Sequence, residues 1–367
     1  MTLTTDCSTP ALHGLPSRGT QQCAQSILDL IQGRLGGMFA RLQHDGPWPG
    51  ATRLTRDTLV ALFFYERNEA DTVHNLLTPL FPDVRQSRLT DPVIIVHLLM
   101  ARLALQRGER QTWLRYLLEL ERIGQQRGNW RIQCSAWLEQ AREATLDNRL
   151  DMARQALHMA EHLSDWDRPG SLLYANDVDH PFVARQRLRV AEGQCAQAIA
   201  ELLPALDRAR ASRHQRRELK LLLLLAMAHD AGSDLQAALL VLDQALDLAS
   251  DEGWLQSFIE EGERLAALLR RRASLRQGQT DGASMFCAEL LRRMTGQAME
   301  TPVAALTARE VKVLHLLAVG HRNRVIAEKL FLSECTVKTH LHRINRKLGA
   351  RDRNQALAIA RRQGWLD

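Results

Sequence analysis

Apolar residues recur at every third or fourth position over most of the chain, from about residue 54 to residue 275. Ile199, Leu202, Leu203 and Leu206 have the i, i+3, i+4, i+7 spacing that lies along one face of an α-helix. Alternation of apolar and polar residues, which indicates strands, is almost absent, and the apolar run 93–96 lies inside a longer helical pattern. The pattern predicts an all-α protein, with Pro204 expected to kink or break its helix.

The helical pattern also repeats. Short polar turns interrupt it at residues 68, 108, 148, 193 and 232, at intervals of 40, 40, 45 and 39, and each turn has a Gly or Asn suited to the left-handed end of a helix. A second helix is expected after each turn, over Ala70–Leu80, Thr112–Arg122, Met152–Leu163, Ala196–Arg208 and Leu235–Leu248. Such units predict a tetratricopeptide-like α-solenoid, with a period longer than the roughly 34 residues of strict tetratricopeptide repeats.

Stacked repeats share one core and leave a curved, extended surface that typically binds a partner. Trp113, Trp130 and Trp137 either line a ligand groove on this surface or pack between repeats, and their helical spacing favours the core. The segment Tyr65–Arg67, at the end of a repeat helix, is expected to be structural.

Composition shifts divide the chain. Residues 1–20, rich in Ser, Thr, Gly and Pro, are expected to form a disordered tail, and residues 44–53 a loop. We expect a helical-repeat sensor or interaction domain over 21–275 and a linker over 276–302 with a short helix at Met285–Thr295. Residues 303–367 form the last domain, and two or three domains also suit a length of 367 residues.

Composition narrows the functional class further. The chain has 45% hydrophobic and 25% charged residues, and no apolar stretch approaches the length of a membrane span. The N-terminus lacks the basic region followed by an apolar region that marks a secretory signal. Its six cysteines lie far apart, with no Cys or His at the spacing of zinc ligands. We therefore expect a cytoplasmic protein without a metal site, a cofactor or a membrane partner. No nucleophile motif is present, so we do not expect an enzyme.

Charge is concentrated at the C-terminal end. Residues 303–367 contain thirteen Lys and Arg against five Asp and Glu, a net charge of +8. The whole chain carries +6, so the other 302 residues carry −2. A basic end on a nearly neutral body indicates nucleic-acid binding.

The basic segment has well-marked helix ends. Thr307 and Glu310 have the spacing of a capping box, and this first helix is expected to end at Gly320. A second helix is expected over about 324–330 with Asn323 as its N-cap, and a third from Ser333 to residue 348. Two helices joined by so short a turn predict a helix-turn-helix, whose second helix enters the major groove of DNA.

The third helix of this segment is amphipathic. One face carries apolar residues that would pack on the two preceding helices: Val337, Leu341, Ile344 and Leu348. The opposite face is polar and cationic, with Thr339, His342, Arg343 and Arg346, flanked by Lys338. Such donors suit guanine edges and phosphates.

These features resemble the LuxR-type (FixJ/NarL-like) DNA-binding domain. The resemblance rests on Leu306–Val311, Gly320, Asn323, Ile326–Leu330, Ser333, Thr336–His340 and Lys347–Gly349. It implies a four-helix domain whose third helix reads DNA and whose last helix, about 353–363, often supports dimerisation. By position it implies that Lys338, Thr339 and His342 face bases, and that the DNA backbone lies near Thr336, Arg322, Arg343, Arg346 and Lys347. The sequence departs from the family at Arg322, Val325 and His342.

The repeats are similar to those of the large ATP-dependent LuxR regulators, the group of the maltose-regulon activator. This similarity rests on Phe64–Glu69, Ala101–Leu103, Leu242–Ala249 and Gly253–Gly262. In that group a nucleotide-binding module precedes an inducer-binding solenoid. No phosphate-binding G-x-x-x-x-G-K-[ST] motif occurs here, so we expect no ATPase activity, in either a short family member or a C-terminal piece of a longer chain.

Two functional hypotheses follow. The first is a sequence-specific transcriptional regulator, by family tendency an activator, that binds double-stranded DNA as a homodimer. Its solenoid would sense a small molecule or protein, and RNA polymerase is a further candidate partner. The alternative is an interaction adaptor that uses its C-terminal domain for protein contacts.

Overall fold

The computed structural model describes residues 18–43, 48, 50–161, 174–178, 180–278, 281–295, 308–330 and 352–362, together with single positions between 337 and 350 and Leu366. These residues form helices and no strands, which confirms the all-α prediction. The repeat region contains the helices α1 (Arg18–Ile31), α2 (Leu35–Leu42), α3 (Gly50–Glu66), α4 (Ala70–Leu77), η1 (Thr78–Leu80), α5 (Phe81–Gln86), α6 (Thr90–Gln106), α7 (Arg110–Arg127), α8 (Trp130–Leu146), α9 (Leu150–Glu161), η2 (Tyr174–Asp177), α10 (Pro181–Ala191), α11 (Cys195–Ala211), α12 (Gln215–Ala231), α13 (Leu235–Ser250), α14 (Gln256–Ile259), α15 (Gly262–Leu275) and α16 (Gly282–Met294). The C-terminal region contains α17 (Ala308–Ala318), α18 (Asn323–Leu330) and α20 (Arg353–Arg362).

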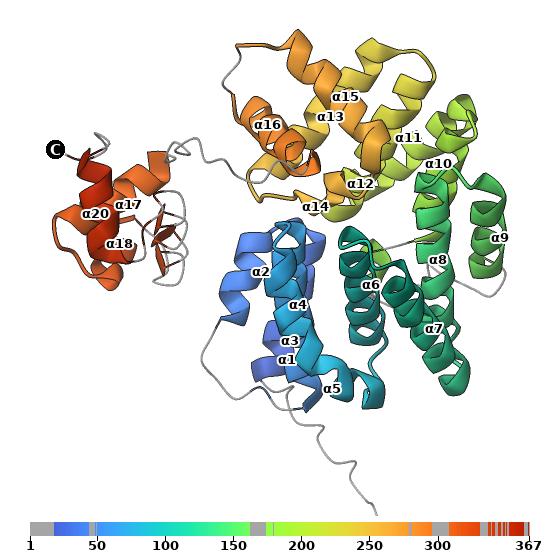
Figure 1. Ribbon diagram of the computed structural model, residues 1–367, viewed down its shortest axis with the longest axis horizontal. Coiled ribbons are helices and arrows are strands. Elements are labelled where there is room, and N and C mark those ends of the chain that lie inside the picture. Colours follow the sequence, from blue (N-terminus) through green and yellow to red (C-terminus); the bar gives the residue numbers. More distant parts are fainter. Residues whose placement is uncertain are drawn as a thin grey trace, which may run out of the picture.

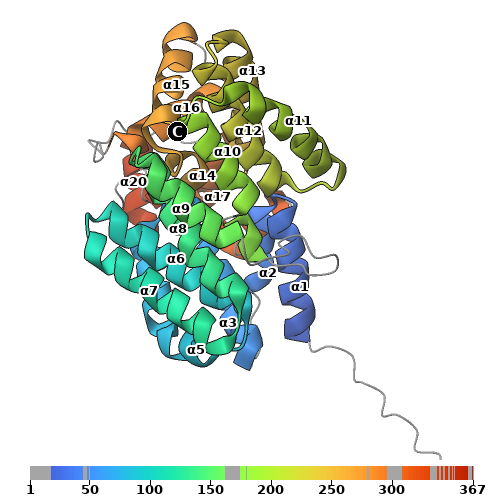
Figure 2. The same cartoon turned by 90° about the vertical axis from the view of Figure 1, so that its right-hand side faces the viewer.

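The helices of the repeat region pair into antiparallel hairpins that follow one another along the chain (Figure 1). Helices α6, α8, α10 and α12 are the first helices of successive pairs, and α7, α9, α11 and α13 are the second ones. Figure 2 shows α6, α8 and α10 side by side, in agreement with the packing of α6 on α8 and of α8 on α10. This arrangement confirms the predicted helical repeat.

Backbone conformation at the turns explains the sequence signal. Asn68, Gly108, Asn148 and Gly193 have φ of 58°, 76°, 58° and 78°, the left-handed values that Asn and Gly tolerate best. At the fifth turn the left-handed residue is Ser233, with φ of 67°, one residue after the predicted Gly232. Ser233 directly precedes Asp234, the N-cap of α13, whose side chain accepts a hydrogen bond from Ala237 N.

Several predicted boundaries move in the structure. Helix α3 begins at Gly50, inside the segment 44–53 that was predicted to be a loop, and Arg56 of α3 lies over the Trp48 ring at 5.4 Å. Helix α11 continues through Pro204 without a break. Helix α1 begins at Arg18, and the rest of the predicted tail, residues 1–17, lies outside the described residues.

The tryptophans predicted to be core residues are packed in the interior. Trp113 and Trp137 are 7% and 9% exposed, and Trp130 packs against the same apolar cluster as Trp137. Helix α6 is buried from Pro92 to Ala104, which explains why its apolar run includes the β-branched residues at 93–96 without forming a strand.

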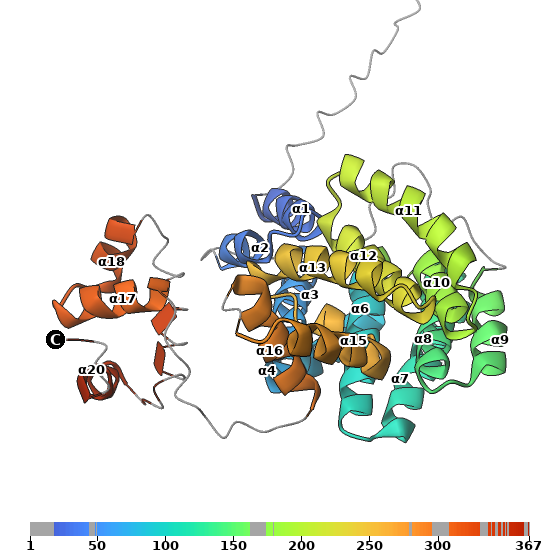
Figure 3. The same ribbon diagram turned by 90° about the horizontal axis from the view of Figure 1, so that it is seen from above.

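The ends of the repeat array touch each other. Helix α1 packs on α12, and Figure 3 shows α1 and α2 beside α12 and α13. The Gly36 amide donates to a carboxylate oxygen of Glu252 at 2.8 Å, which ties α2 to the end of the last repeat. The hairpin of α1 and α2, which precedes the predicted repeats, therefore connects the first and last parts of the array.

The short helix α14 lies at the centre of the repeat region, between α3 and α12 (Figure 1). Its segment starts at Gly253 and ends at Gly262, with φ of 74° and 70°. The Leu255 amide donates to the carbonyl of Glu66 at 2.9 Å, and Phe258 is fully buried. The segment thus packs against α3 and α12 in the interior of the repeat region.

The C-terminal domain has a core of its own. Val313, Leu314 and Leu317 of α17 pack with Ile326 of α18 in one apolar cluster, which Ala356 and Ala360 of α20 complete. No described helix in either region is long and apolar enough to cross a membrane.

Candidate functional site: the basic domain and the repeat interior

The start of the helix-turn-helix is set by the connection between α17 and α18. Gly320 has φ of 93°, and the His321 amide donates to the Leu316 carbonyl at 3.2 Å, which closes α17 as predicted. Helix α18 begins at Asn323, and the Arg322 carbonyl accepts from the Ile326 amide at 3.0 Å. Arg322, rather than the predicted Asn323, is therefore the N-cap of α18.

The third helix of the domain is described only at single positions. Residues 337, 338, 340, 341, 344, 345 and 348 are helical. Its predicted apolar face is confirmed, because Val337 and Ile344 are fully buried, Leu348 is 6% exposed and Leu341 packs against the same cluster.

Lys338 is exposed and directly follows the buried Val337, so it belongs to the solvent side of this helix. Arg322 is also exposed, at the start of α18. The other predicted DNA contacts lie outside the described residues: Thr336, Thr339, His342, Arg343, Arg346 and Lys347.

Cations in the described part of this domain lie at the surface. Lys312, Arg322, Lys329 and Lys338 are exposed and form no ion pair with a carboxylate among the described residues, whereas the exposed Arg324 pairs with Glu328 at 3.3 Å. Arg353 instead donates to the carbonyls of Leu317 and His321 at 3.3 and 3.1 Å, and so fixes α20 to the end of α17. This surface presents positive charge that a polyanion can neutralise.

Arginines of the repeat region are arranged differently. Arg102, Arg142 and Arg187 each lie six residues before a left-handed turn residue, on α6, α8 and α10. Their side chains are 4%, 8% and 8% exposed. Because the position is the same in three successive repeats, the three guanidinium groups form a buried row, which we call the arginine row.

Acids of the α14 segment and of α8 neutralise the arginine row. Arg102 pairs with Glu139 at 2.7 Å and with Glu260 at 2.9 Å. Arg142 pairs with Glu139 at 2.6 Å. Arg187 and Glu261 form a two-bond pair at 2.8 and 2.6 Å. The arginine row therefore holds the segment 253–262 in place.

The segment predicted to be structural, Tyr65–Arg67, takes part in the same contact. Tyr65 donates a hydrogen bond to Glu260. Glu66 accepts from Arg216 and from Ser257, both at 2.9 Å. These residues thus connect α3 to the α14 segment and to α12.

Charged groups in this interior interact strongly because water is excluded. Burial by itself would raise the pKa of Glu260, but Arg102, Arg142 and Lys220 outweigh it and hold that pKa at about 2. Burial is the main cause that lowers the pKa of Lys220 to about 8, and Arg216 lowers it further. The Lys220 ammonium donates to the carbonyl of Val178 at 3.0 Å.

The arginine row was not singled out from the sequence. A signal was present, because Arg recurs at a fixed distance before three turns, where an apolar residue is otherwise expected on the buried side of a helix. Its acidic partners carry no comparable signal, since Glu260 lies 158 residues from Arg102.

Comparison with known proteins agrees with this division. The MalT-like TPR region matches residues 54–275, and the family described as bacterial regulatory proteins, luxR family, matches residues 304–360. Similar curated proteins include the Bacillus subtilis uncharacterized transcriptional regulatory protein YxjL, 45% identical over 86 residues, which are 23% of this chain and 39% of that protein.

Two further relatives match over the same C-terminal part. The Brevibacillus brevis transcriptional regulatory protein DegU is 43% identical over 65 residues, 18% of this chain and 28% of that protein. The Mycobacterium tuberculosis probable transcriptional regulatory protein NarL is 48% identical over 67 residues, 18% of this chain and 31% of that protein. The matches thus span less than two-fifths of the length of each relative. The chain belongs to the family with the MalT-like TPR region, and its C-terminal segment is the DNA-binding domain of LuxR-type transcriptional regulators.

Proposed function

We propose that this protein is a cytoplasmic transcriptional regulator that binds promoter DNA through its C-terminal domain and changes its activity when the repeat region binds an effector. The observation that carries the proposal is the exposed Lys338 on a helix whose opposite face, with Val337 and Ile344, is buried in a LuxR-type domain. A lysine in this position can donate to guanine edges in the major groove.

Other DNA contacts follow from the sequence. Thr339 and His342 join Lys338 as base-reading residues. The backbone contacts are Thr336, Arg322, Arg343, Arg346 and Lys347. Exposed cations that form no ion pair among the described residues support a large electrostatic share of the affinity, which makes binding depend strongly on salt.

The repeat region is the sensor in this proposal, and the LuxR-type domain acts as a homodimer on paired half-sites. Activation of transcription, through a contact with RNA polymerase, is the expected direction of regulation. The contacts between the first and last helices of the array support a sensing role, because an effector bound between repeats would change how they pack.

Gel shifts of the full chain on genomic fragments test the DNA part of the proposal. We expect retarded complexes whose affinity falls steeply as salt rises, and footprints with two half-sites. If no fragment is retarded at any salt concentration, the interaction adaptor replaces the regulator as the function.

Sensing is tested by footprinting a promoter with and without cell extract metabolites below about 1 kDa. An effector that acts through the repeat region should change the affinity of the full chain and leave that of residues 303–367 unchanged. Equal responses of both proteins would contradict the assignment of sensing to the repeats.

A further inference from the structure

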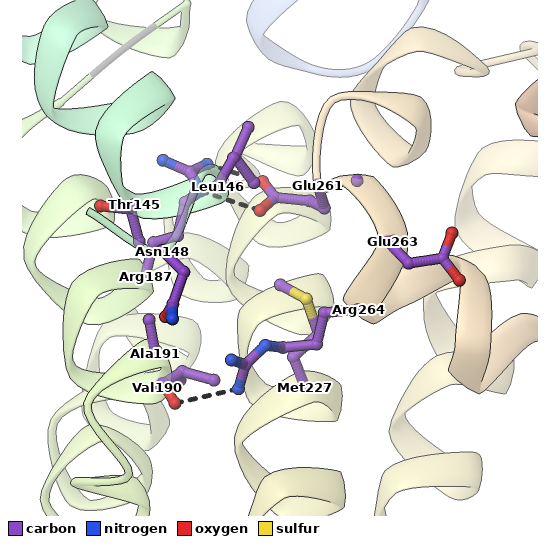
Figure 4. A pocket seen from close by; sticks show the side chains of 11 residues that line it. Thr145, Leu146, Asn148, Arg187, Val190, Ala191, Met227, Glu261, Glu263 and Arg264 are labelled. Carbon is purple, nitrogen blue, oxygen red and sulfur yellow. Dashed lines mark hydrogen bonds and ion pairs between the residues drawn. The ribbon is translucent and has the colours of Figure 1, made fainter. Parts of the chain in front are cut away.

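A pocket of about 460 Å³ opens between the repeats, beside the last member of the arginine row. Its walls come from the end of α8, from α10, from α12 and from the start of α15 (Figure 4). Its volume is in the range of small-molecule sites.

Charges in the pocket wall do not cancel. Arg187 and Glu261 neutralise each other in their two-bond pair. Glu263 points away from the other lining side chains in Figure 4 and binds Arg270 at 2.7 Å. Arg264 is exposed and donates to the carbonyl of Val190 at 3.0 Å, and it forms no ion pair with a carboxylate among the described residues. One guanidinium charge therefore remains for a ligand.

Part of the remaining wall is apolar. Leu146, Val190, Ala191 and Met227 line it beside the polar Thr145 and Asn148, and Met227 is only 3% exposed. The apolar part of a ligand that packs against these side chains is removed from water, and this burial of apolar surface favours binding. The pocket therefore combines one cation with a surface for a short hydrocarbon body.

We propose that this pocket binds a small organic carboxylate with an apolar body, and that this ligand is the effector of the repeat region. One guanidinium matches one carboxylate in charge and in two-bond geometry. A phosphate ester carries nearly two negative charges at neutral pH, about one of which Arg264 would leave unpaired. The effector role rests on the proposed sensing function, whereas the ligand class and its binding rest on the pocket itself.

The pocket is placed to affect the whole array. Its walls join residues near 146, 190, 227 and 264, so a bound ligand connects α8, α10, α12 and α15. Arg187 and Glu261, which hold the α14 segment, form part of the same wall. Ligand binding thus favours one packing of the repeats around the central segment.

The test uses the full chain and hexanoate, with binding followed by saturation-transfer NMR. Hexanamide serves as the uncharged analogue. We expect hexanoate to bind the parent protein and Arg264→Met to weaken it by about ten- to hundredfold, since a charge-assisted hydrogen-bond pair is removed. Hexanamide should bind parent and Arg264→Met equally and weakly.

Arg271→Met is the matched control, because it removes the same charge from α15 at a residue that, like its partner Asp230, lies outside the pocket lining. It should bind hexanoate like the parent. Leu146→Trp is a second variant: Leu146 is 37% exposed, so a larger side chain fits at the rim and narrows the pocket. It should reduce hexanoate binding even if Arg264→Met does not fold.

Three results would overturn the inference: no binding of hexanoate to the parent, equal binding to Arg264→Met, or equal binding of hexanamide and hexanoate. If the protein binds DNA but not hexanoate, the pocket proposal is wrong and the proposed regulator function stands. If it binds hexanoate but no DNA, the pocket proposal stands and the proposed regulator function is wrong.

Discussion

Arginine has opposite uses in the two regions of this protein. In the repeat region, Arg102, Arg142 and Arg187 are buried and paired with carboxylates at 2.6–2.9 Å. In the C-terminal domain, Arg322 and Lys338 are exposed and form no ion pair with a carboxylate among the described residues. The arginine row is neutralised within the chain and holds it together, whereas Arg322 and Lys338 are available to DNA. The net charges, −2 for residues 1–302 and +8 for residues 303–367, do not show which individual cations are paired and which are exposed.

The largest effect is expected from breaking the arginine row. Arg102→Met leaves the buried Glu139 and Glu260 with fewer cationic partners, so unfolding free energy should fall by about 3–5 kcal/mol. Urea titrations followed by tryptophan fluorescence measure this, because six of the seven tryptophans precede residue 276.

Arg154→Met is the control for that prediction. Arg154 pairs with Asp151 and Glu192 but its side chain is 57% exposed, so its loss should lower the unfolding free energy far less than the loss of Arg102. If the two substitutions lower the unfolding free energy equally, burial does not distinguish the arginine row from exposed arginines.

Acid should weaken the repeat region through Glu260. Its pKa is about 2 in the fold against an ordinary 4.5, so between these values the unfolded chain binds more protons. The stabilisation is complete above about pH 4.5 and is lost as the pH falls towards 2, by about 3 kcal/mol in all.

Glu260→Gln should therefore flatten the dependence of the urea midpoint on pH between about 4.5 and 3. Glu263→Gln changes a carboxylate that is 79% exposed on α15 and should leave that dependence unchanged. An unaltered pH profile in Glu260→Gln would show that the α14 acids do not depend on the arginine row.

The third prediction concerns the exposed side of the comparison. Lys338→Ala should reduce discrimination between the operator and single-base variants by about 1–3 kcal/mol at the base pair that Lys338 contacts. Because Lys338 is exposed, stability should change by less than about 0.5 kcal/mol.

Competition gel shifts with operator variants measure this loss of discrimination. Lys312→Ala removes the same charge from α17 and should preserve the base preference. A loss of preference in both variants would mean that general charge, and not the position of Lys338, sets the specificity.

Local features of this fold could be predicted from the sequence, and long-range ones could not. Turns at Asn68, Gly108, Asn148 and Gly193 follow from the conformational preference of single residues, and the buried face of the third C-terminal helix follows from its period. Ser233 shows the limit of this reasoning, since it takes the left-handed conformation although Gly232 is its neighbour.

The position of the α14 segment has no local cause. Its amide at Leu255 bonds to Glu66, nearly 190 residues earlier, and Tyr65 reaches Glu260 across a similar separation. Periodicity describes how a helix meets its neighbours in sequence, and therefore cannot show which late segment covers the interior of the array. The repeat could therefore be predicted from periodicity. The position of the α14 segment on its inner face and the pocket at Arg264 could not.

The smallest effect is expected from Arg322, at the start of α18. Arg322→Ala should weaken binding to all DNA sequences equally and reduce the slope of log affinity against log salt by about 0.9, the change for one lost phosphate contact. Arg361→Ala removes the same charge from the exposed side of α20 and should leave the slope nearly unchanged. Affinities measured at four or more salt concentrations separate these outcomes. An unchanged slope in Arg322→Ala would place this arginine away from the DNA backbone. Because Arg322 and Lys338 are both exposed, that result would show that exposure alone does not identify the cations that bind DNA.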